Sequence, residues 1–167
     1  IKQFIYDLNL EGIPVSPVDY AMQKLRDAGL RVEEITGRDS RIEYRPDGTQ
    51  RYRKRPAKDR SIAGKLKIIS DFNEDRTDAL VINQSGATGL SLHALPKWEG
   101  HDPAARKMIL LQAEANIDTH MQMLGRVHRA GQVKPPSYIK LMCDIPTEKR
   151  PAAVLLGKMA SLNANTT

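Results

Sequence analysis

The 167-residue sequence contains a single cysteine, Cys143, and this scarcity limits the chemistry open to the chain. No disulfide can form within the chain, which agrees with a reducing compartment. Cys143 follows an apolar run, so we expect it in a strand as a small buried hydrophobic residue and not as a reactive thiol. His120 and His128 are eight residues apart without a matched ligand set, and no metal site is predicted.

Long apolar runs are also missing. No stretch reaches the about 18 apolar residues that suggest a transmembrane helix, so no contact with a membrane is predicted. The first residues form no signal-peptide pattern, and the sequence starts with Ile1. We therefore expect an excised part of a longer chain.

Two elements that hold nucleotides in many proteins are absent as well. No Gly-x-x-x-x-Gly-Lys-Ser/Thr loop occurs, because Gly64–Lys65 is followed by leucine and has no glycine five residues before Gly64. No acidic pair follows a hydrophobic strand to hold magnesium. The chain is nevertheless long enough to bury a core as one domain over residues 1–167.

Helical and strand patterns alternate along the chain, which is the signature of an α/β fold. Ser16 and Pro17 have the character of an N-cap and a first helical residue, and Gly29 is placed to close that helix. The helix over 61–72 is expected to bury Ile62 and Leu66. The remaining predicted elements are strands over 30–35, 79–82, 108–111 and 138–142, a helix starting near residues 116–118, and a last helix over 148–162.

Residues 37–60 form a basic insertion with nine basic and four acidic side chains. Pro46, Asp47 and Gly48 predict a turn between two short strands. One interpretation is a solvated, mobile insertion, because charge runs are commonly just exposed. The other is a basic hairpin on a nucleic-acid backbone, with interleaved tyrosines available to stack and with Arg51, Arg53, Lys54 and Arg55 as the contacts.

Residues 122–132 contain Arg126 and Arg129, three residues apart. On a helix their guanidinium groups project from the same face. Such a pair suits phosphate oxygens and would stabilise charge on a transferred phosphoryl group. Gly125 permits a close approach beside Arg126, and Gly131 is expected to end the helix. The alternative is a solvated basic face, the usual fate of arginines on a helix.

Residues 83–92 place glycines and small side chains immediately after a buried strand. Such a turn lets the backbone approach a ligand at the carboxyl end of the sheet, where open α/β folds bind ligands. We expect the two arginines to lie beside this glycine turn at the same edge. Alone, a glycine-rich turn of this kind is weak evidence.

The two runs resemble known motifs. Residues 122–132 are similar to motif VI (QxxGRxxR) of superfamily 2 helicases and translocases, and residues 83–92 resemble motif V. With residues 13–20, 34–38 and 148–150, they make the chain similar to the C-terminal helicase lobe of Strawberry notch-type proteins. The resemblance implies a RecA-like three-layer sandwich, with a mostly parallel central sheet and helices on both faces.

The resemblance also implies roles for individual residues. Arg126 and Arg129 would act as arginine fingers, and Gln122 would couple the nucleotide to the neighbouring lobe. Gly89 and Ser91 would contact the nucleotide, although many relatives carry an acidic residue or asparagine where Ser91 stands. The short polar side chains of Asn83 and Ser85 would contact nucleic-acid backbone without reading sequence. ATP and Mg²⁺ would be held mainly by the N-terminal RecA-like lobe of the parent chain.

The implied function is the second motor lobe of an ATP-dependent DNA helicase or translocase, inactive as an isolated piece. Strawberry notch-type proteins include bacterial and phage members, some fused to DNA methylases. Residues 116–120 depart from the pattern of the animal members, so we expect a cytoplasmic, bacterial or phage-encoded protein for which a fused methylase is a further partner. Two other classes stay open: a non-catalytic nucleic-acid-binding module and a regulatory protein-interaction scaffold.

Overall fold

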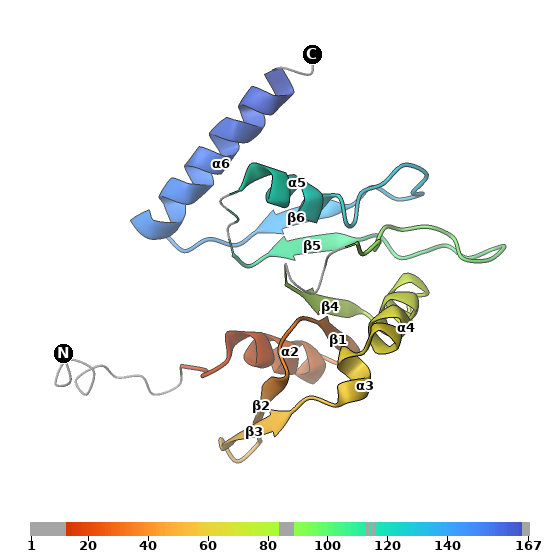
Figure 1. The fold of residues 1–167 in the computed structure, drawn as a ribbon, viewed down its shortest axis with the longest axis vertical. Coiled ribbons are helices and arrows are strands. Elements are labelled where there is room, and N and C mark those ends of the chain that lie inside the picture. Colours follow the sequence, from red (N-terminus) through yellow and green to blue (C-terminus); the bar gives the residue numbers. More distant parts are fainter. Residues whose placement is uncertain (1–12, 84–88, 113, 115, 165–167) are drawn as a thin grey trace.

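The computed structural model describes residues 13–83, 89–112, 114 and 116–164. Helices and strands alternate, and the α/β class predicted from the sequence is confirmed (Figure 1). The elements in order are α2 (Pro17–Asp27), β1 (Val32–Ile35), β2 (Ser40–Tyr44), β3 (Gln50–Lys54), α3 (Ala57–Arg60), α4 (Ile62–Asn73), β4 (Ala79–Ile82), β5 (Lys107–Leu110), α5 (Ile117–Leu124), β6 (Ser137–Lys140) and α6 (Pro146–Ala164).

Hydrogen bonds join the described strands in three pairs. β1 and β4 are parallel with Ile35 opposite Ile82, and β5 and β6 are parallel with Met108 opposite Tyr138. Helix α4 lies in the crossover from β1 to β4 and α5 in the crossover from β5 to β6, the usual connection between parallel strands. These parallel pairs are compatible with the RecA-like fold. Within the described residues they form separate two-stranded sheets and not one continuous sheet.

Helices α2, α4 and α5 begin where the sequence predicts, because each of these starts carries its own cap, whereas α3 was not predicted and has no side-chain cap. Ser16, Ser61 and Asn116 each precede a helix and accept a hydrogen bond from a backbone N–H of its first turn, at 3.3, 3.0 and 3.1 Å. Gly29, just after α2, has a φ of 84°, which glycine adopts without strain. Local side-chain chemistry is therefore sufficient to start these elements.

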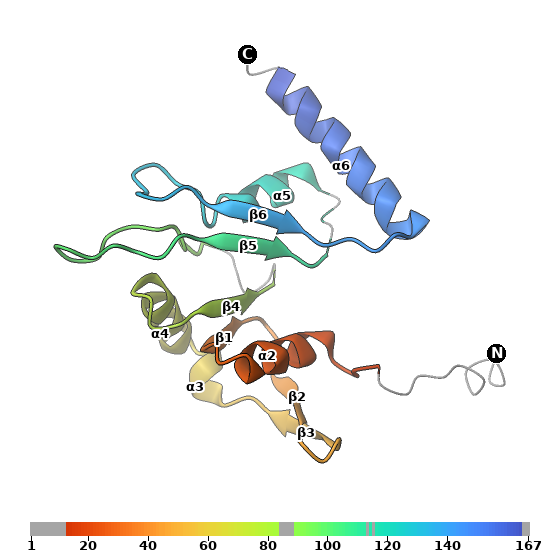
Figure 2. The same ribbon diagram turned by 180° about the vertical axis from the view of Figure 1, so that it is seen from behind.

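A hydrophobic core joins the two halves of the molecule. Figures 1 and 2 show β1–β4, α2 and α4 in one half, β5, β6 and α5 in the other, and α6 projecting away from the second half. Met108 and Leu110 of β5 are buried, and Leu80 and Ile82 of β4 pack against them. The segments that contain Leu92 and Val127 contribute to the same core, so the two runs singled out by the sequence are packed together. The other members are Ile69, Phe72, Leu90, Met123 and Leu124.

Some apolar side chains expected inside lie at the surface. Ile62 and Leu66 of α4 are 81% and 60% exposed, and the helix buries Ile68 instead. Cys143 is exposed and lies beyond β6, so the prediction of a buried cysteine in a strand is wrong. Apolar spacing identifies the face of a helix, but the neighbours that cover this face are set by the rest of the fold.

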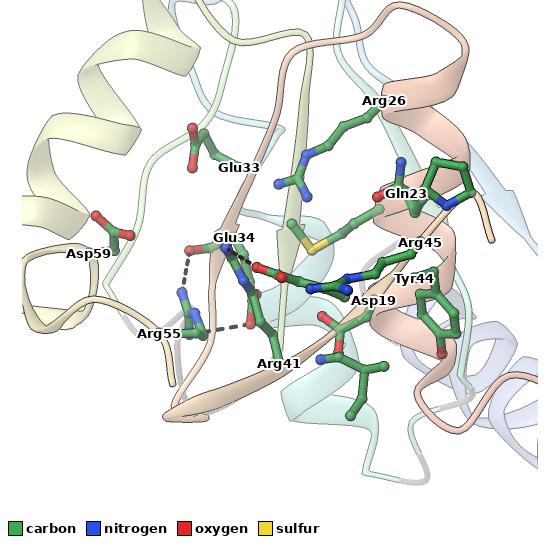
Figure 3. Close-up of a pocket in the computed structure, with 14 residues that line it drawn as sticks. Asp19, Gln23, Arg26, Glu33, Glu34, Arg41, Tyr44, Arg45, Arg55 and Asp59 are labelled. Carbon is green, nitrogen blue, oxygen red and sulfur yellow. Dashed lines mark hydrogen bonds and ion pairs between the residues drawn. The ribbon is translucent and has the colours of Figure 1, made fainter. Parts of the chain in front are cut away.

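A buried charge network attaches residues 37–60 to α2 and β1. Arg38 donates from Nη1 to Asp19 Oδ2 at 2.8 Å and from Nε to Glu34 Oε1 at 2.6 Å. Asp19 Oδ2 also accepts from the backbone N of Ile42 at 2.7 Å. Arg55 lies 3.3 Å from Glu34, beside a pocket of about 330 Å³ between α2, β1 and β2 (Figure 3). Burial raises the pKa of the two carboxyls, but hydrogen bonds from Arg38 keep each pKa below its usual value.

Replacing Arg38 with methionine should lower the free energy of unfolding by about 3 kcal/mol near pH 7, because two buried carboxylates would lose their shared partner. Urea unfolding of the two proteins measures this difference. Arg31→Met is the matched control, because Arg31 pairs with Asp78 at the exposed surface and its loss should cost little.

The contribution of Arg38 should also disappear in acid. Because the pKa values of Asp19 and Glu34 are lowered in the folded state, the network stabilises the protein above the unfolded-state values of about 4. This stability is lost as the pH falls through the folded-state values. The difference between wild type and Arg38→Met should therefore shrink below about pH 4, and a difference that stays constant would contradict the network.

Candidate functional site

Helix α5 ends before the two arginines. Its last residue is Leu124, and Gly125 is its C-cap, with the backbone continuing as a turn through Arg126. The prediction that Arg126 and Arg129 share one helical face is therefore wrong, and so is the prediction that Gly131 ends this helix. Gly131 instead has a φ of 85° in the turn that follows.

Arg126 joins the two motif-like segments. Its Nη1 donates to the carbonyl oxygen of Leu90 at 3.3 Å, and its own carbonyl oxygen accepts from the backbone N of Leu92 at 2.8 Å. Further along, the backbone N of Val133 donates to the carbonyl oxygen of Ala94 at 3.1 Å. Residues 90–94 therefore run beside residues 126–133, and Gly89 lies one residue before the first of these contacts.

An open pocket of about 560 Å³ lies over the arginine segment. Gln122 and Arg129 line it together with Arg126, so the three residues predicted to be catalytic share one surface. Within the described part of the chain, no acidic side chain pairs with either arginine. Their charge is available to an anion. The other lining residues are Gly125, His128 and Ala130.

Ser91 is held from two sides next to this pocket. Its Oγ lies 2.8 Å from His93 Nδ1, and its carbonyl oxygen accepts from Asn73 Nδ2 at 3.1 Å. Burial lowers the pKa of the His93 imidazole, and the nearby charge of Arg129 lowers it further. Sequence reasoning missed His93, although its position two residues after Ser91 was a usable signal.

Gly89, Asn83 and Ser85 are the other residues predicted to contact nucleotide or nucleic acid. Gly89 is exposed and has a φ of 77°, with open space where a side chain would start, so backbone conformation and not crowding requires a glycine. Asn83 is exposed and follows β4 directly, at its carboxyl end. Ser85 lies outside the described residues.

The four basic residues predicted to contact nucleic acid separate into two groups. Arg51, Arg53 and Lys54 lie on β3, which is exposed along its whole length. Arg55 is buried, and its guanidinium donates to the carbonyl oxygens of Arg38 at 2.8 Å and Glu34 at 3.2 Å. The prediction that Arg55 contacts nucleic acid is wrong, because its donors are used inside the protein.

The arginine pocket does not lie at the carboxyl edge, where we expected it. Tyr138, near the start of β6, donates its hydroxyl to the carbonyl oxygen of Leu124 at 3.2 Å. The end of α5 therefore lies near the amino end of β6, because α5 begins beyond the carboxyl end of β5 and runs back along the pair (Figure 1). Asn83 and the arginines consequently occupy different sides of the molecule.

The described residues contain neither a metal-binding cluster nor a membrane-spanning helix. No group of three or more histidine, cysteine, aspartate or glutamate side chains in the part described could hold a metal ion. Within those same ranges, every helix is too short or too polar to cross a membrane.

The sequence matches a family model described as the C-terminal domain on Strawberry notch homologue over residues 19–167. The chain is 30% identical over 155 residues to human protein strawberry notch homolog 2, covering 92% of the chain and 11% of that protein. It is 29% identical over 156 residues to the Drosophila melanogaster protein strawberry notch, covering 92% and 9%. The Arabidopsis thaliana protein FORGETTER 1 is 26% identical over 170 residues, covering 99% and 12%.

The chain thus spans about a tenth of the length of these relatives. They come from human, fly and plant, and they do not support the bacterial or phage origin expected from the sequence. A fused methylase is not shown by their names either. The match to the family model over most of the chain does confirm the resemblance stated above.

Replacing Arg129 with alanine should raise the pKa of His93, because a nearby cation that disfavours the protonated ring is removed. The pKa should stay below the usual value of about 6.5, since burial is the largest cause and remains. An NMR titration of the imidazole signals measures both effects. His120 is the internal control, because its pKa is lowered by burial and Lys140 and should not change. An unchanged pKa of His93 would show that Arg129 lies elsewhere.

Proposed function

The chain belongs to the family of Strawberry notch C-terminal helicase domains, and from this membership we propose that it is the second motor lobe of an ATP-dependent DNA helicase or translocase. One observation carries the proposal: Gln122, Arg126 and Arg129 share an open pocket without acidic partners among the described residues. A pair of unneutralised guanidinium groups suits the oxygens of a phosphate chain.

The residues around the pocket fit a nucleotide. In the proposed role, Arg126 and Arg129 donate to the γ-phosphate and offset its negative charge as it is transferred. Arg126 commits one donor to the carbonyl of Leu90 and is thereby held in place. Ser91, fixed by His93, would contact the ribose, and Gly89 would let the backbone come close to the nucleotide. When bound, ATP with Mg²⁺ supplies the phosphoryl group that water accepts.

The proposal requires a second lobe. The sequence has no phosphate-binding loop of the Gly-Lys-Ser/Thr type and no acidic pair for Mg²⁺. We assign these functions to an N-terminal RecA-like lobe of the parent chain, which would face the pocket. Gln122, on the last turns of α5, would couple the nucleotide to that lobe.

Nucleic acid would bind at the other side of the domain. Asn83 leaves the carboxyl end of β4, and its short amide side chain can donate to phosphate without reading sequence. The chain then continues toward Leu90 and the arginine pocket. The same segment of chain would thus touch DNA at its start and the nucleotide at its end.

A regulatory protein-interaction scaffold is the second candidate, and exposed apolar side chains favour it. Ile109 and Leu111 of the β5 region are 52% and 64% exposed, and Ile139 and Leu141 of the β6 region are 39% and 52% exposed. Ile109 and Ile139 lie opposite each other in the register. Clustered apolar residues at a surface commonly mark a protein contact.

In the full-length protein, Arg129→Ala should reduce DNA-stimulated ATP hydrolysis by roughly 10³-fold to 10⁵-fold, the usual effect of removing an arginine finger. Arg129→Lys should also be strongly impaired, because an ammonium group lacks the planar, bidentate donors of a guanidinium. A steady-state phosphate-release assay at saturating DNA measures these rates.

Arg150→Ala is the matched control, because it removes one exposed arginine from α6, outside the pocket. Its rate should equal that of the wild type. A wild-type rate for Arg129→Ala would refute the motor proposal and leave the scaffold or a non-catalytic nucleic-acid-binding module as the better account.

A further inference from the structure

Residues 37–60 have no role in the motor function proposed above. They leave the sheet at the carboxyl end of β1. Because β1 and β4 are parallel and Ile35 lies opposite Ile82, Asn83 leaves the sheet at the same edge. The hairpin of β2 and β3 therefore starts on the side of the domain assigned to nucleic acid, whereas the arginine pocket lies elsewhere.

β3 presents cations to solvent along its whole length. All five of its residues are exposed, and Arg51 and Arg53 share one face because alternate residues of a strand point the same way. Two residues of a strand span about 6.6 Å. The long side chains of Arg51 and Arg53 can therefore reach neighbouring phosphates of one nucleic-acid strand.

The acidic side chains of the hairpin do not neutralise this row. Glu43 is shared between Arg41 at 3.0 Å and Arg53 at 3.4 Å, so its single charge faces two cations. Asp47 is used within the turn, where it accepts two hydrogen bonds from Thr49. The face that carries Arg51 and Arg53 also carries Arg41 and Glu43, and it therefore keeps an excess of positive charge.

The hairpin is fixed at both ends. At the turn end, Tyr44 of β2 exchanges hydrogen bonds with the backbone of Ser16, its hydroxyl accepting at 2.9 Å and donating at 3.0 Å. The buried Arg55 ties the end of β3 to the carbonyl oxygen of Arg38, and Figure 3 shows it beside Glu34. A ligand of β3 would not have to order a flexible loop, which lowers the entropic cost of binding.

We propose that the β2–β3 hairpin binds the sugar–phosphate backbone of a nucleic acid through Arg51 and Arg53, without reading sequence. This contact adds to that of Asn83 and rests on the proposed function only for the presence of a nucleic-acid partner. Tyr52 lies between the two arginines in sequence but on the opposite face of β3, where its hydroxyl is hydrogen-bonded to Ser40 Oγ, so the contact is assigned to the two arginines alone. Linear, regularly spaced cations suit a polyanion better than a single small anion.

The test compares the full-length wild type with Arg51→Ala/Arg53→Ala, using a labelled duplex and a labelled single strand of mixed sequence without nucleotide. The salt dependence of the binding constant should fall by about two in log–log slope, one for each lost phosphate contact. Between about 50 and about 200 mM salt, the wild type should lose about tenfold more affinity than the variant. Arg51→Lys/Arg53→Lys should keep most of the slope, since the charges remain.

Lys149→Ala/Arg150→Ala is the matched control, because it removes the same net charge from α6, in the other half of the molecule (Figure 1). Its slope should equal that of the wild type. A reduced slope with either probe, in the hairpin variant alone, supports the proposal. An unchanged slope, or an equal reduction in the α6 control, overturns it.

The two proposals fail separately. DNA binding is measured without nucleotide, so it does not depend on ATP hydrolysis. Wild-type ATP hydrolysis by the Arg129→Ala protein would refute the motor function, and the binding test of the hairpin would remain valid. An unchanged salt slope in Arg51→Ala/Arg53→Ala overturns the hairpin contact, while the hydrolysis result stands. Circular dichroism of the hairpin variant should match the wild type, because both side chains are exposed on β3.

Discussion

The backbone contact between Leu92 and Arg126 is the interaction on which the candidate site depends. The N–H of Leu92 donates to the carbonyl of Arg126 at 2.8 Å, while the side chain of Leu92 and that of Val127 are buried in one core. A hydrogen bond shielded by packed apolar side chains is protected from competing water. Two stretches more than 30 residues apart in sequence are thereby held side by side, and the backbone of Arg126 is fixed at the pocket that its side chain lines.

The course of α5 separates the arginine pocket from the carboxyl ends of β1 and β4. Helix α5 starts beyond the carboxyl end of β5 and returns toward the amino end of β6, where Tyr138 meets Leu124. The arginines are carried away from the carboxyl edge, where β4 ends before Asn83 and the segment leading to the hairpin leaves β1. Asn83 and Leu90 are seven residues apart, so a short stretch of chain separates the end of β4 from the residue that binds Arg126.

Local features were predictable and tertiary ones were not. Ser16, Ser61 and Asn116 begin helices because the cap side chain and the backbone N–H that donates to it lie within three residues of each other. The order of elements and the α/β class follow from such signals. How α5 ends does not, because the segment after Gly125 bonds to Leu90 and Leu92, far away in sequence.

Arg55 shows the same limit for charged residues. In the sequence, Arg55 cannot be distinguished from the exposed cations of the hairpin. In the structure it is buried, because it donates to the backbone of Glu34 and Arg38, which lie 21 and 17 residues earlier. The pocket at Arg126 and Arg129 has the opposite character, since it is wide open to water. At physiological salt, charges there are screened over about 8 Å, and a phosphate would gain little from them. Once an opposing surface expels the water, the local dielectric falls and the same two cations attract several times more strongly. The attraction of Arg126 and Arg129 for a phosphate therefore depends on the surface that covers the pocket.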